Sequence, residues 1–336
     1  MIEQPLVSII GPIHNTSQYL DQCIKSLCNQ TLHDIEIICV NDASTDNSLD
    51  ILKKYKDIDK RVEIIDLKEN VMAGGARNRG IKQAKGLYLG FVDSDDFVSP
   101  FMYQYLVEGS NSLTCDIVTT HWYVNYGLRG ETRANVSPPV SSDIQEVIGY
   151  MAKYGARLWT SIFKKDYFIN NNFRFPEKIY YEDNALAGLF FKTKSIAVIN
   201  NIKPLYYYRI SNISSITKSE LSDKKIFDRI ESSVMMYDSL KHCGQYEKFK
   251  DEFDYKVYKI FFYNTIYMLL MKSKKYPNSF IKLVCQRYLE CVGNFPSNNK
   301  YFKKKDMYLN MVGKYPMLGI PIFFIKRVFS IIKTIN

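Results

Sequence analysis

The sequence predicts an α/β protein built on a doubly wound sheet, followed by a helical C-terminal region. Short apolar segments alternate four times with helical patterns at a spacing of about 25–30 residues. Such alternation builds a parallel sheet with helices on both faces. Polar side chains collect where the predicted strands end, and beyond residue 222 the sequence becomes helical, aromatic and basic. These three observations define the predicted architecture.

The four predicted strands of the first half are short apolar runs rich in β-branched residues. They are Leu6–Ile10, Ile35–Val40, Val62–Asp66 and Leu87–Val92. The first is expected to close at Gly11-Pro12, because this pair is typical of a turn. The helices between them are expected after Ser17, which is a good N-cap, after the polar turn 41–47, and over 73–85.

The pattern after residue 115 is mixed. Residues 116–122 are compatible with a strand, 125–142 with a polar loop, 144–154 with a helix and 185–191 with an apolar helix. We expect one domain over 1–220, with halves 1–115 and 116–220, and a helical region over 221–336, of which 315–336 is a candidate for contact with a membrane interface.

Composition excludes several classes of protein. Of the 336 residues, 46% are hydrophobic and 24% charged, which excludes a disordered or fibrous chain. No apolar run is long enough for a membrane-spanning helix, and no secretory signal is recognised. Seven cysteines without a C-x-x-C pair indicate reduced thiols in the cytoplasm.

The most informative acidic group is Asp93-Ser94-Asp95-Asp96, directly after the fourth predicted strand. In an open α/β sheet, ligands bind beyond the carboxyl ends of the strands. Magnesium is usually held by one or two carboxylates together with substrate phosphates. We therefore interpret this group as a clamp for a metal ion and a diphosphate, against the alternative of a solvated acidic turn.

Three further groups are candidates of different strength. Asp42 follows the second strand and is interpreted as a ligand for a base or ribose, while Asp46 is assigned a structural role. The segment Gly74–Gly80 has neither P-loop nor dinucleotide spacing, so nucleotide contact and a plain helix start stay equally open. Asp183 precedes an apolar helix, where the residues alone favour an acidic cap over a general base.

Five segments in order resemble the family 2 inverting glycosyltransferases with the GT-A fold. They are V-S-I-I-G-P-I-H-N at 7–15, V-N-D-A-S-T-D at 40–46, A-R-N at 76–78, V-D-S-D-D at 92–96 and E-D at 182–183. The resemblance covers roughly residues 5–217. It implies a mixed sheet with a Rossmann-like nucleotide-binding half. The Q-x-x-R-W signature of processive members is absent, which argues against a processive synthase.

The resemblance also implies a site and its ligands. Residues lining the nucleotide-sugar pocket would be Pro12, His14, Asn15, Asp42, Arg77, Asp93 and Ser94. Asp95 would bind Mg²⁺ or Mn²⁺, and Asp183 would be the catalytic base. The donor would be a nucleotide-sugar, by default a UDP-sugar, and the acceptor a glycan or lipid-linked glycan of a bacterial polysaccharide such as capsule, O-antigen or exopolysaccharide.

The charge of the chain is uneven. From Lys241 onward, 18 Lys and Arg stand against 6 Asp and Glu, although the net charge of the whole chain is +10. A basic, aromatic tail favours an anionic membrane surface, and we expect the enzyme on the cytoplasmic face of the inner membrane. Nucleic acid is not expected as a partner. The alternatives kept open are a nucleotidyltransferase that makes activated sugars and a non-catalytic nucleotide-sugar-binding protein.

Overall fold

The structure is a computed structural model, and the chain divides into two compact units, Met1–Lys218 and Ser219–Asn336. Each unit is described by itself. The described residues are 4–120, 123–127, 130–134, 144–154, 157–199, 203–210, 212, 220–273, 275–295, 301 and 304–320.

The first unit is organised around a seven-stranded sheet in the order β10-β6-β9-β4-β1-β2-β3. Its strands are β1 (Val7–Ile13), β2 (Ile35–Asp42), β3 (Val62–Leu67), β4 (Tyr88–Phe91), β6 (Ile117–Thr120), β9 (Ser161–Lys164) and β10 (Ile196–Ile199). Only β9 runs antiparallel to its neighbours β4 and β6. The predicted α/β fold with a mixed sheet is confirmed.

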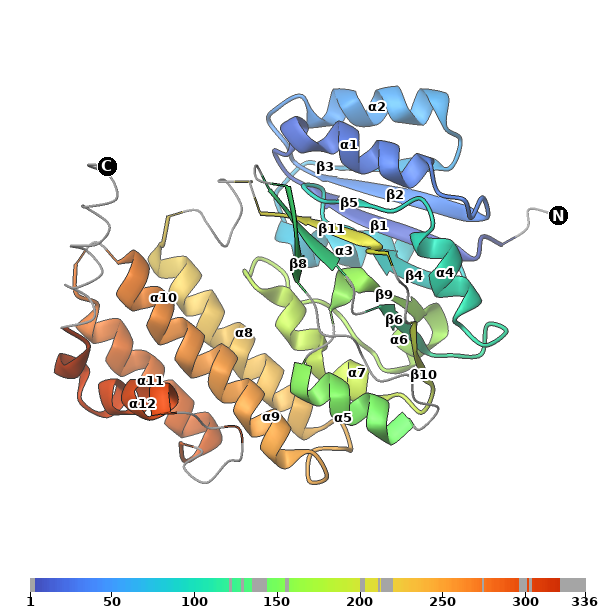
Figure 1. The fold of residues 1–336 in the computed structure, drawn as a ribbon. Helices are drawn as coiled ribbons and strands as arrows, with labels where there is room; N and C mark the ends of the chain where they lie inside the picture. The colour runs from blue at the N-terminus through green and yellow to red at the C-terminus, as the bar shows by residue number, and fades with distance from the viewer. Residues whose placement is uncertain are drawn as a thin grey trace. The chain divides into compact units, whose positions relative to one another are not determined.

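Helices cover both faces of this sheet. The first three are α1 (Ser17–Cys28), α2 (Ser48–Ile58) and α3 (Met72–Gln83). Right-handed crossovers from β1 to β2 to β3 put α1 and α2 on one face, and the return from β3 to β4 puts α3 on the other, as Figure 1 shows. The chain order therefore reverses between β1 and β4. That switch point is where open α/β sheets bind ligands.

The centre of the sheet is buried from both sides. Every residue of β2 is buried, and Ile9 and Ile37 are at most 1% exposed. Burial of both faces explains why these strands appear in the sequence as continuous apolar runs.

The first strand runs past its predicted end at Gly11-Pro12 and finishes at Ile13. This prediction was wrong because the ladder with β4 ends at the Ile10–Phe91 pair, while pairing with β2 continues to Ile13 and Asn41. Beyond Ile10 the strand is thus paired on one side only, which tolerates a proline.

The second half of the unit adds a smaller sheet in the order β5-β11-β7-β8. Its strands are β5 (Phe97–Val98), β7 (Tyr123–Gly127), β8 (Gly130–Ala134) and β11 (Tyr206–Arg209). The polar loop predicted over 125–142 is wrong in its first part, because β7 and β8 pair there as a hairpin. Residues 135–143 and 121–122 lie outside the described residues.

The remaining elements of this unit are short helices. They are α4 (Met102–Glu108), α5 (Ile144–Tyr154), the 3-10 helix η1 (Leu158–Thr160), α6 (Lys165–Asn170), the 3-10 helix η2 (Glu182–Gly188) and α7 (Leu189–Lys192). The prediction of a helix over 144–154 is confirmed. The helix predicted over 185–191 is instead a 3-10 segment that becomes α-helical at Leu189.

The second unit is helical in its described residues, as predicted. Its elements are α8 (Asp223–Lys241), α9 (Lys250–Val257), the π-helical turn η3 (Tyr258–Tyr263), α10 (Asn264–Lys272), α11 (Asn278–Val292), α12 (Lys304–Lys314) and η4 (Pro316–Gly319). Within the described ranges, no helix has the length and apolar character needed to cross a bilayer. Residues 321–336, most of the segment considered for membrane contact, lie outside those ranges.

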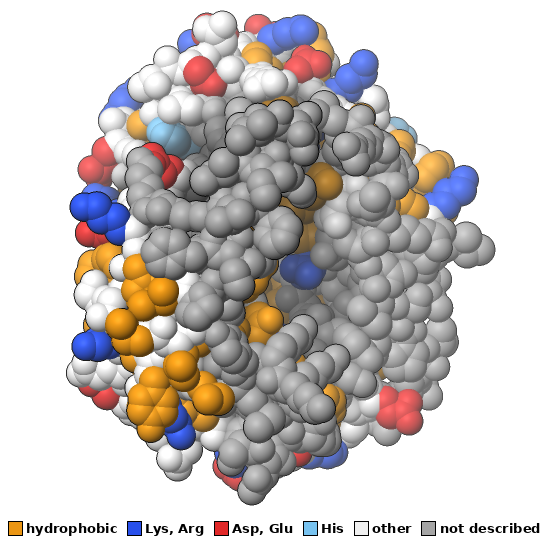
Figure 2. All heavy atoms as spheres, turned by 60° about the vertical axis from the view of Figure 1, so that its left-hand side comes forward, with side chains coloured by type: hydrophobic (Ala, Val, Ile, Leu, Met, Phe, Trp, Pro, Cys, Tyr) orange, Lys and Arg blue, Asp and Glu red, His pale blue; other side chains and the backbone are white. Residues whose placement is uncertain are grey.

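Some hydrophobic side chains of this unit are exposed. Met311, Tyr315 and Met317 are each at least half exposed, and they lie close in sequence to Lys314. On the face shown in Figure 2, hydrophobic side chains gather at the lower left of the view with Lys or Arg side chains beside them.

Candidate active site

Three loops meet at the carboxyl edge of the sheet, after β1, β2 and β4. The Nδ1 atom of His14 lies 2.7 Å from the backbone oxygen of Asp42. The hydroxyl of Thr16 donates to Ser94 at 3.0 Å. The backbone N–H of Ser17 donates to Asp46 at 2.9 Å. These bonds join the ends of three strands into one frame, as the positions of the polar residues in the sequence predict.

The loop after β1 is fixed by its own polar side chains. Asn15 adopts a left-handed backbone conformation, with φ of 53°. Its side-chain oxygen accepts the backbone N–H of Thr45 at 2.8 Å, so it organises the neighbouring loop. His14 is exposed, and because the Asp42 carbonyl can only accept, Nδ1 of His14 carries the proton. The imidazole is thus held through Nδ1, its Nε2 lies 3.4 Å from the side-chain nitrogen of Asn15, and the residue is exposed to solvent.

The loop after β2 contains the carboxylate predicted to be structural. Partial burial favours the protonated form of Asp46, but hydrogen bonds from Ser48 and Ser17 outweigh it and lower the pKa of Asp46 to about 2. The carboxylate accepts the N–H groups at the starts of α1 and α2. Thr16, rather than the predicted Ser17, is the N-cap of α1, and its hydroxyl is used for the bond to Ser94.

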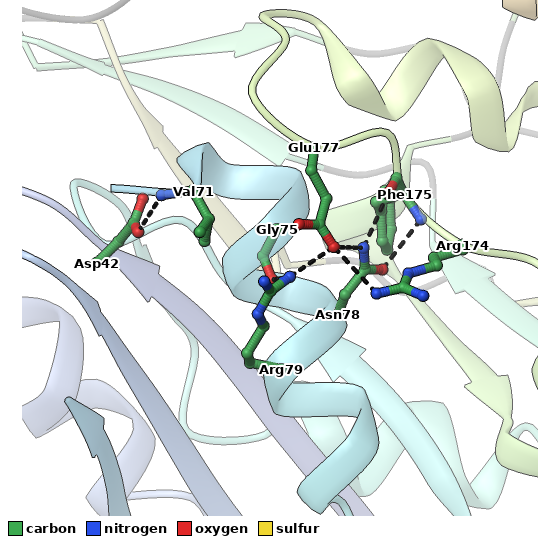
Figure 3. Close-up of polar contacts among 8 residues, drawn as sticks. All are labelled: Asp42, Val71, Gly75, Asn78, Arg79, Arg174, Phe175 and Glu177. Atoms are coloured by element: carbon green, nitrogen blue, oxygen red, sulfur yellow. Dashed lines mark hydrogen bonds and ion pairs between the residues drawn. The ribbon is translucent and has the colours of Figure 1, made fainter. Parts of the chain in front are cut away.

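Asp42 ends β2 and is buried, with 2% of its surface exposed. One carboxylate oxygen accepts the backbone N–H of Val71 at 2.7 Å, the contact drawn at the left of Figure 3. Burial raises the pKa of Asp42, while this hydrogen bond opposes the rise. Asp42 thus ties β2 to the start of α3. Its contact with a nucleotide stays a prediction.

The acidic segment after β4 gives each of its three aspartates different surroundings. Asp96 is fully buried and accepts bonds from the Tyr206 hydroxyl and the Arg209 N–H, both at 2.7 Å. Burial and the nearby charges of Asp95 and Asp93 raise its pKa. Asp96 is therefore a structural residue that anchors β11 to the segment.

Asp95 is half-buried and accepts a bond from the Asn212 side chain at 2.8 Å. Its backbone oxygen accepts Nε of Arg209 at 2.7 Å. Burial and the charge of Asp93 raise the pKa of Asp95 against the bond from Asn212. In the described part of the chain, the Asp95 carboxylate forms no ion pair with a Lys or Arg. A carboxylate in such surroundings favours a bound cation.

Arg77, on α3, joins the acidic segment to a distant part of the chain. Its guanidinium donates to Asp93 at 2.8 Å and also to Glu182 at the start of η2. Only 4% of the residue is exposed, and the guanidinium lies 5.6 Å from the ring centre of Phe175. Both carboxylates raise the pKa of Arg77 although burial opposes this. The predicted contact of Arg77 with the nucleotide stays a prediction, because its described partners are carboxylates.

Asp183 follows Glu182 directly and differs from it in exposure. The Glu182 side chain is 8% exposed, whereas Asp183 is classed as exposed. The Asp183 carboxyl nevertheless has protein atoms densely around it, and this burial, followed by the charge of Glu182, raises its pKa to about 6. The charge of Arg77 acts against the rise. Solvent access within dense surroundings is the combination that a general base in a cleft requires.

The loop before η2 is fastened to α3 by side chains that the sequence analysis did not single out. The amide of Asn78 bonds to both the oxygen and the N–H of Phe175, at 2.9 and 3.0 Å. Glu177 accepts Arg79 at 2.5 Å and Arg174 at 3.2 Å, as Figure 3 shows. The contacts of Asn78 and Arg79 with this loop span 97 and 98 positions, so periodicity gives no signal for them.

Gly74 serves close packing in this structure. A Cβ atom built on Gly74 would lie 2.2 Å from the backbone oxygen of Pro176 and 3.1 Å from Cγ of Glu182. The absence of a side chain therefore lets α3 approach the segment that carries Glu182 and Asp183.

Comparisons with known proteins agree with this arrangement. The family model described as glycosyl transferase family 2 matches residues 8–190, more than half of the chain. The chain belongs to glycosyl transferase family 2. Members of this family are inverting glycosyltransferases, so the activity is glycosyl transfer with inversion. The match decides against the nucleotidyltransferase and non-catalytic alternatives.

Individual relatives are similar to different extents. The uncharacterized glycosyltransferase EpsJ of Bacillus subtilis is 28% identical over 285 residues, covering 82% of this chain and 80% of EpsJ. The putative teichuronic acid biosynthesis glycosyltransferase TuaG of the same organism is 42% identical over 93 residues, covering 28% of this chain and 37% of TuaG. The fold is similar to that of S. aureus TarS 1–349 in complex with UDP-GlcNAc, with a TM-score of 0.66, 21% identity, and coverage of 85% and 81%.

The structure brings most of the predicted site residues to one region. His14, Asn15, Asp42, Ser94 and Asp95 lie at the carboxyl edge, together with Pro12 and Asp93. Arg77 connects this edge to the Glu182-Asp183 pair. Arg77 thus joins the segments that carry Asp95 and Asp183, and a common site for these two carboxylates is a proposal. Their individual roles are proposals.

The donor set also fits a divalent cation that shares its ligands with a substrate. Among the described residues, no group of three or more His, Cys, Asp or Glu is arranged to hold a metal. A protein-only metal site is therefore not built there. Magnesium sites that use one or two carboxylates and complete their shell with phosphates need no such group. Asp95 suits this second type, whereas the neighbouring Asp93 is paired with Arg77.

Proposed function

We propose that this protein transfers one sugar from a nucleotide-sugar to a hydroxyl group of a glycan or lipid-linked glycan. One observation carries the proposal. The buried guanidinium of Arg77 binds Asp93 at the strand end and Glu182 beside Asp183, and this link between the acidic segment and the segment of an exposed carboxylate supports a common site. A UDP-sugar is the first candidate donor, supported by the similarity to TarS, which was solved with UDP-GlcNAc.

The donor site is proposed at the switch point between β1 and β4. His14 would stack on the base, since its ring is positioned by Asp42 and Asn15 and the residue is exposed to solvent. Asp42 would contact the base or ribose through the oxygen that Val71 does not use. Ser94, next to Thr16, would lie by the ribose or diphosphate. Pro12 and Asn15 would shape the wall of the pocket.

Asp95 would hold Mg²⁺ or Mn²⁺, while Asp93, paired with Arg77, would lie by the ribose and diphosphate. When bound, such an ion stabilises the negative charge that develops on the departing diphosphate. The raised pKa of Asp95 is consistent with this assignment, because burial and a neighbouring carboxylate disfavour its charge when no cation is present.

Asp183 would remove the proton from the acceptor hydroxyl. The acceptor oxygen then bonds to the anomeric carbon, and the bond from that carbon to the diphosphate oxygen breaks with its electron pair. Attack from the face opposite the leaving group inverts the configuration. The base must be ionised, and burial raises the pKa of Asp183 to about 6, so we expect activity to fall as the pH drops below about 6.

The biological setting is proposed as bacterial surface polysaccharide synthesis. The short but closer similarity to TuaG, named for teichuronic acid biosynthesis, supports this setting. The basic C-terminal third and the exposed Met311, Tyr315 and Met317 support contact with an anionic membrane surface where lipid-linked acceptors reside. Flotation of the full chain with anionic and neutral vesicles tests this contact, and equal binding to both would remove the electrostatic part.

A donor screen tests the catalytic proposal. Release of nucleoside diphosphate is measured for a panel of UDP-, GDP- and TDP-sugars with bacterial glycan fractions as acceptors, with and without EDTA. We expect one donor to be favoured, loss of activity with EDTA and recovery with Mn²⁺. The anomeric configuration of the product is then read by NMR. Full activity in EDTA would remove the metal from the proposal.

A further inference from the structure

We propose that Asn212 is a positioning residue, whose amide holds the Asp95 carboxylate in the orientation that binds a divalent cation. This inference rests on the proposed role of Asp95 as the metal ligand. It gives a function to a residue three positions beyond the end of β11, outside the five segments that carry the family resemblance.

The contact between the two side chains is direct. The Nδ2 atom of Asn212 lies 2.8 Å from Oδ2 of Asp95. Because an ionised carboxylate only accepts hydrogen bonds, the amide presents its N–H group, and not its oxygen, to Asp95. Asn212 is 4% exposed and Asp95 is half-buried. The amide thus fixes the rotation of the carboxylate through Oδ2, and we assign the other oxygen, Oδ1, to the cation.

The end of β11 is joined to the same acidic segment through its backbone. Nε of Arg209 donates to the backbone oxygen of Asp95 at 2.7 Å. The backbone N–H of Arg209 donates to the Asp96 carboxylate, also at 2.7 Å. The chain is therefore fixed relative to Asp95 three residues before Asn212.

The guanidinium of Arg209 is itself held from several sides. Arg209 is 8% exposed, and a terminal nitrogen of the guanidinium donates to the side-chain oxygen of Gln22 on α1 at 2.5 Å. Aromatic rings from α1, β5 and β7 surround it, with ring centres 4.9, 5.5 and 5.4 Å from the guanidinium carbon, and they belong to Tyr19, Phe97 and Tyr126. Hydrogen bonds and cation–π contacts together give the guanidinium one preferred position. The junction between β11 and the acidic segment is therefore rigid enough to orient a ligand.

A carboxylate with a fixed direction binds a cation more tightly than one that rotates. Groups that donate hydrogen bonds to a metal ligand typically contribute 10–100-fold to metal affinity. Without the Asn212 amide, Asp95 keeps its charge but loses this constraint. We therefore expect weaker binding of the cation, with folding and nucleotide binding retained.

The test is the affinity for Mn²⁺, measured by electron paramagnetic resonance with UDP at a saturating concentration. This measurement needs neither the sugar donor nor the acceptor. We expect N212A to weaken Mn²⁺ binding by about tenfold. The matched control is N41A, because Asn41 is 2% exposed and its amide likewise donates to a carboxylate, that of Asp66, at 2.7 Å. N41A is expected to bind Mn²⁺ with the affinity of the wild type.

A double variant shows whether Asn212 acts through Asp95. D95N/N212A is expected to bind Mn²⁺ as weakly as D95N alone, because the second substitution removes a contact to a ligand that is already lost. A further loss in the double variant would mean that Asn212 acts on the cation independently of Asp95.

Three results overturn the inference. These are an unchanged Mn²⁺ affinity in a folded N212A, an equal loss in N41A, and a further loss in D95N/N212A. A purely structural role would lower the urea midpoint of N212A and leave its Mn²⁺ affinity in place. If N212A does not fold, N212S replaces it with the same expected loss, because the serine hydroxyl is too short to reach Asp95. Failure of the metal assignment itself has a different signature, since D95N would then bind Mn²⁺ like the wild type.

Discussion

Removal of the Arg77 cation gives the sharpest stability prediction. In R77M the Glu182 carboxylate, 8% exposed, is left without its partner in the interior. Breaking a buried ion pair in this way costs about 3–5 kcal/mol. The Asp93 carboxylate is 32% exposed, so its lost pair with Arg77 adds little to the loss of stability. Water solvates this carboxylate, and exposed ion pairs contribute below about 1 kcal/mol. We therefore expect R77M to lose about 3–5 kcal/mol of unfolding free energy at pH 7.5.

Urea unfolding followed by tryptophan fluorescence measures this loss. Both tryptophans of the chain, Trp122 and Trp159, belong to the first unit, so the signal reports on the unit that contains Arg77. Trp159 stacks on Tyr206 at 4.3 Å between ring centres, which makes its emission sensitive to unfolding.

The matched control is R79M, on the same helix. Arg79 pairs with Glu177, but these side chains are 34% and 28% exposed, so the same substitution should cost below about 1 kcal/mol. The double variant R77M/E182Q should recover part of the loss, because it leaves no charge unpaired on Glu182. A loss below about 1 kcal/mol in R77M, or an equal loss in R79M, would refute the reasoning.

The remaining predictions concern packing, anchoring and the metal. Gly74→Ala places a methyl group against the Pro176 backbone and should lower the unfolding free energy by about 1–3 kcal/mol. The control Gly11→Ala should be tolerated, because its new methyl group meets only ordinary van der Waals contacts. Equal melting temperatures of the two variants would contradict this prediction. Tyr206→Phe removes the hydrogen bond to the buried Asp96 and should lower the unfolding free energy, measured with urea, by about 1–2 kcal/mol. An unchanged urea midpoint would show that Asp96 does not need this hydrogen bond. Asp95→Asn should weaken Mn²⁺ binding in the presence of UDP by at least about tenfold, measured by electron paramagnetic resonance. An unchanged affinity for Mn²⁺ would show that Asp95 is not a metal ligand.

The sequence predicted the parts of the fold that depend on local pattern. The buried strands around Ile9 and Ile37 were found because burial on both faces produces continuous apolar runs. The collection of polar residues at one edge followed from parallel pairing. The hairpin of β7 and β8 was missed because β8 is largely polar, although β7 contains Tyr and Val residues that are typical of strands. The extension of β1 through Pro12 depends on where β4 stops, which the segment itself does not encode.

The candidate site was predicted as a set of residues, but its connections were not. The bonds from Arg77 to Asp93 and Glu182 span 16 and 105 positions, and no spacing rule relates them. Asn78 was quoted only as part of the A-R-N segment and Glu177 was missed, because their contribution is to hold the loop before η2. Asp183 was weighed as a helix cap from its residues alone, and only the family resemblance pointed to a base. Its access to solvent and raised pKa are three-dimensional properties.

The most direct test of the account is glycosyl transfer by D183N. The account predicts a fall in kcat of at least about a thousandfold, because the neutral amide of asparagine cannot take the acceptor proton, while UDP affinity by calorimetry and the urea midpoint stay close to those of the wild type. Turnover within a few-fold of the wild type, with the protein folded and the donor bound, would contradict it.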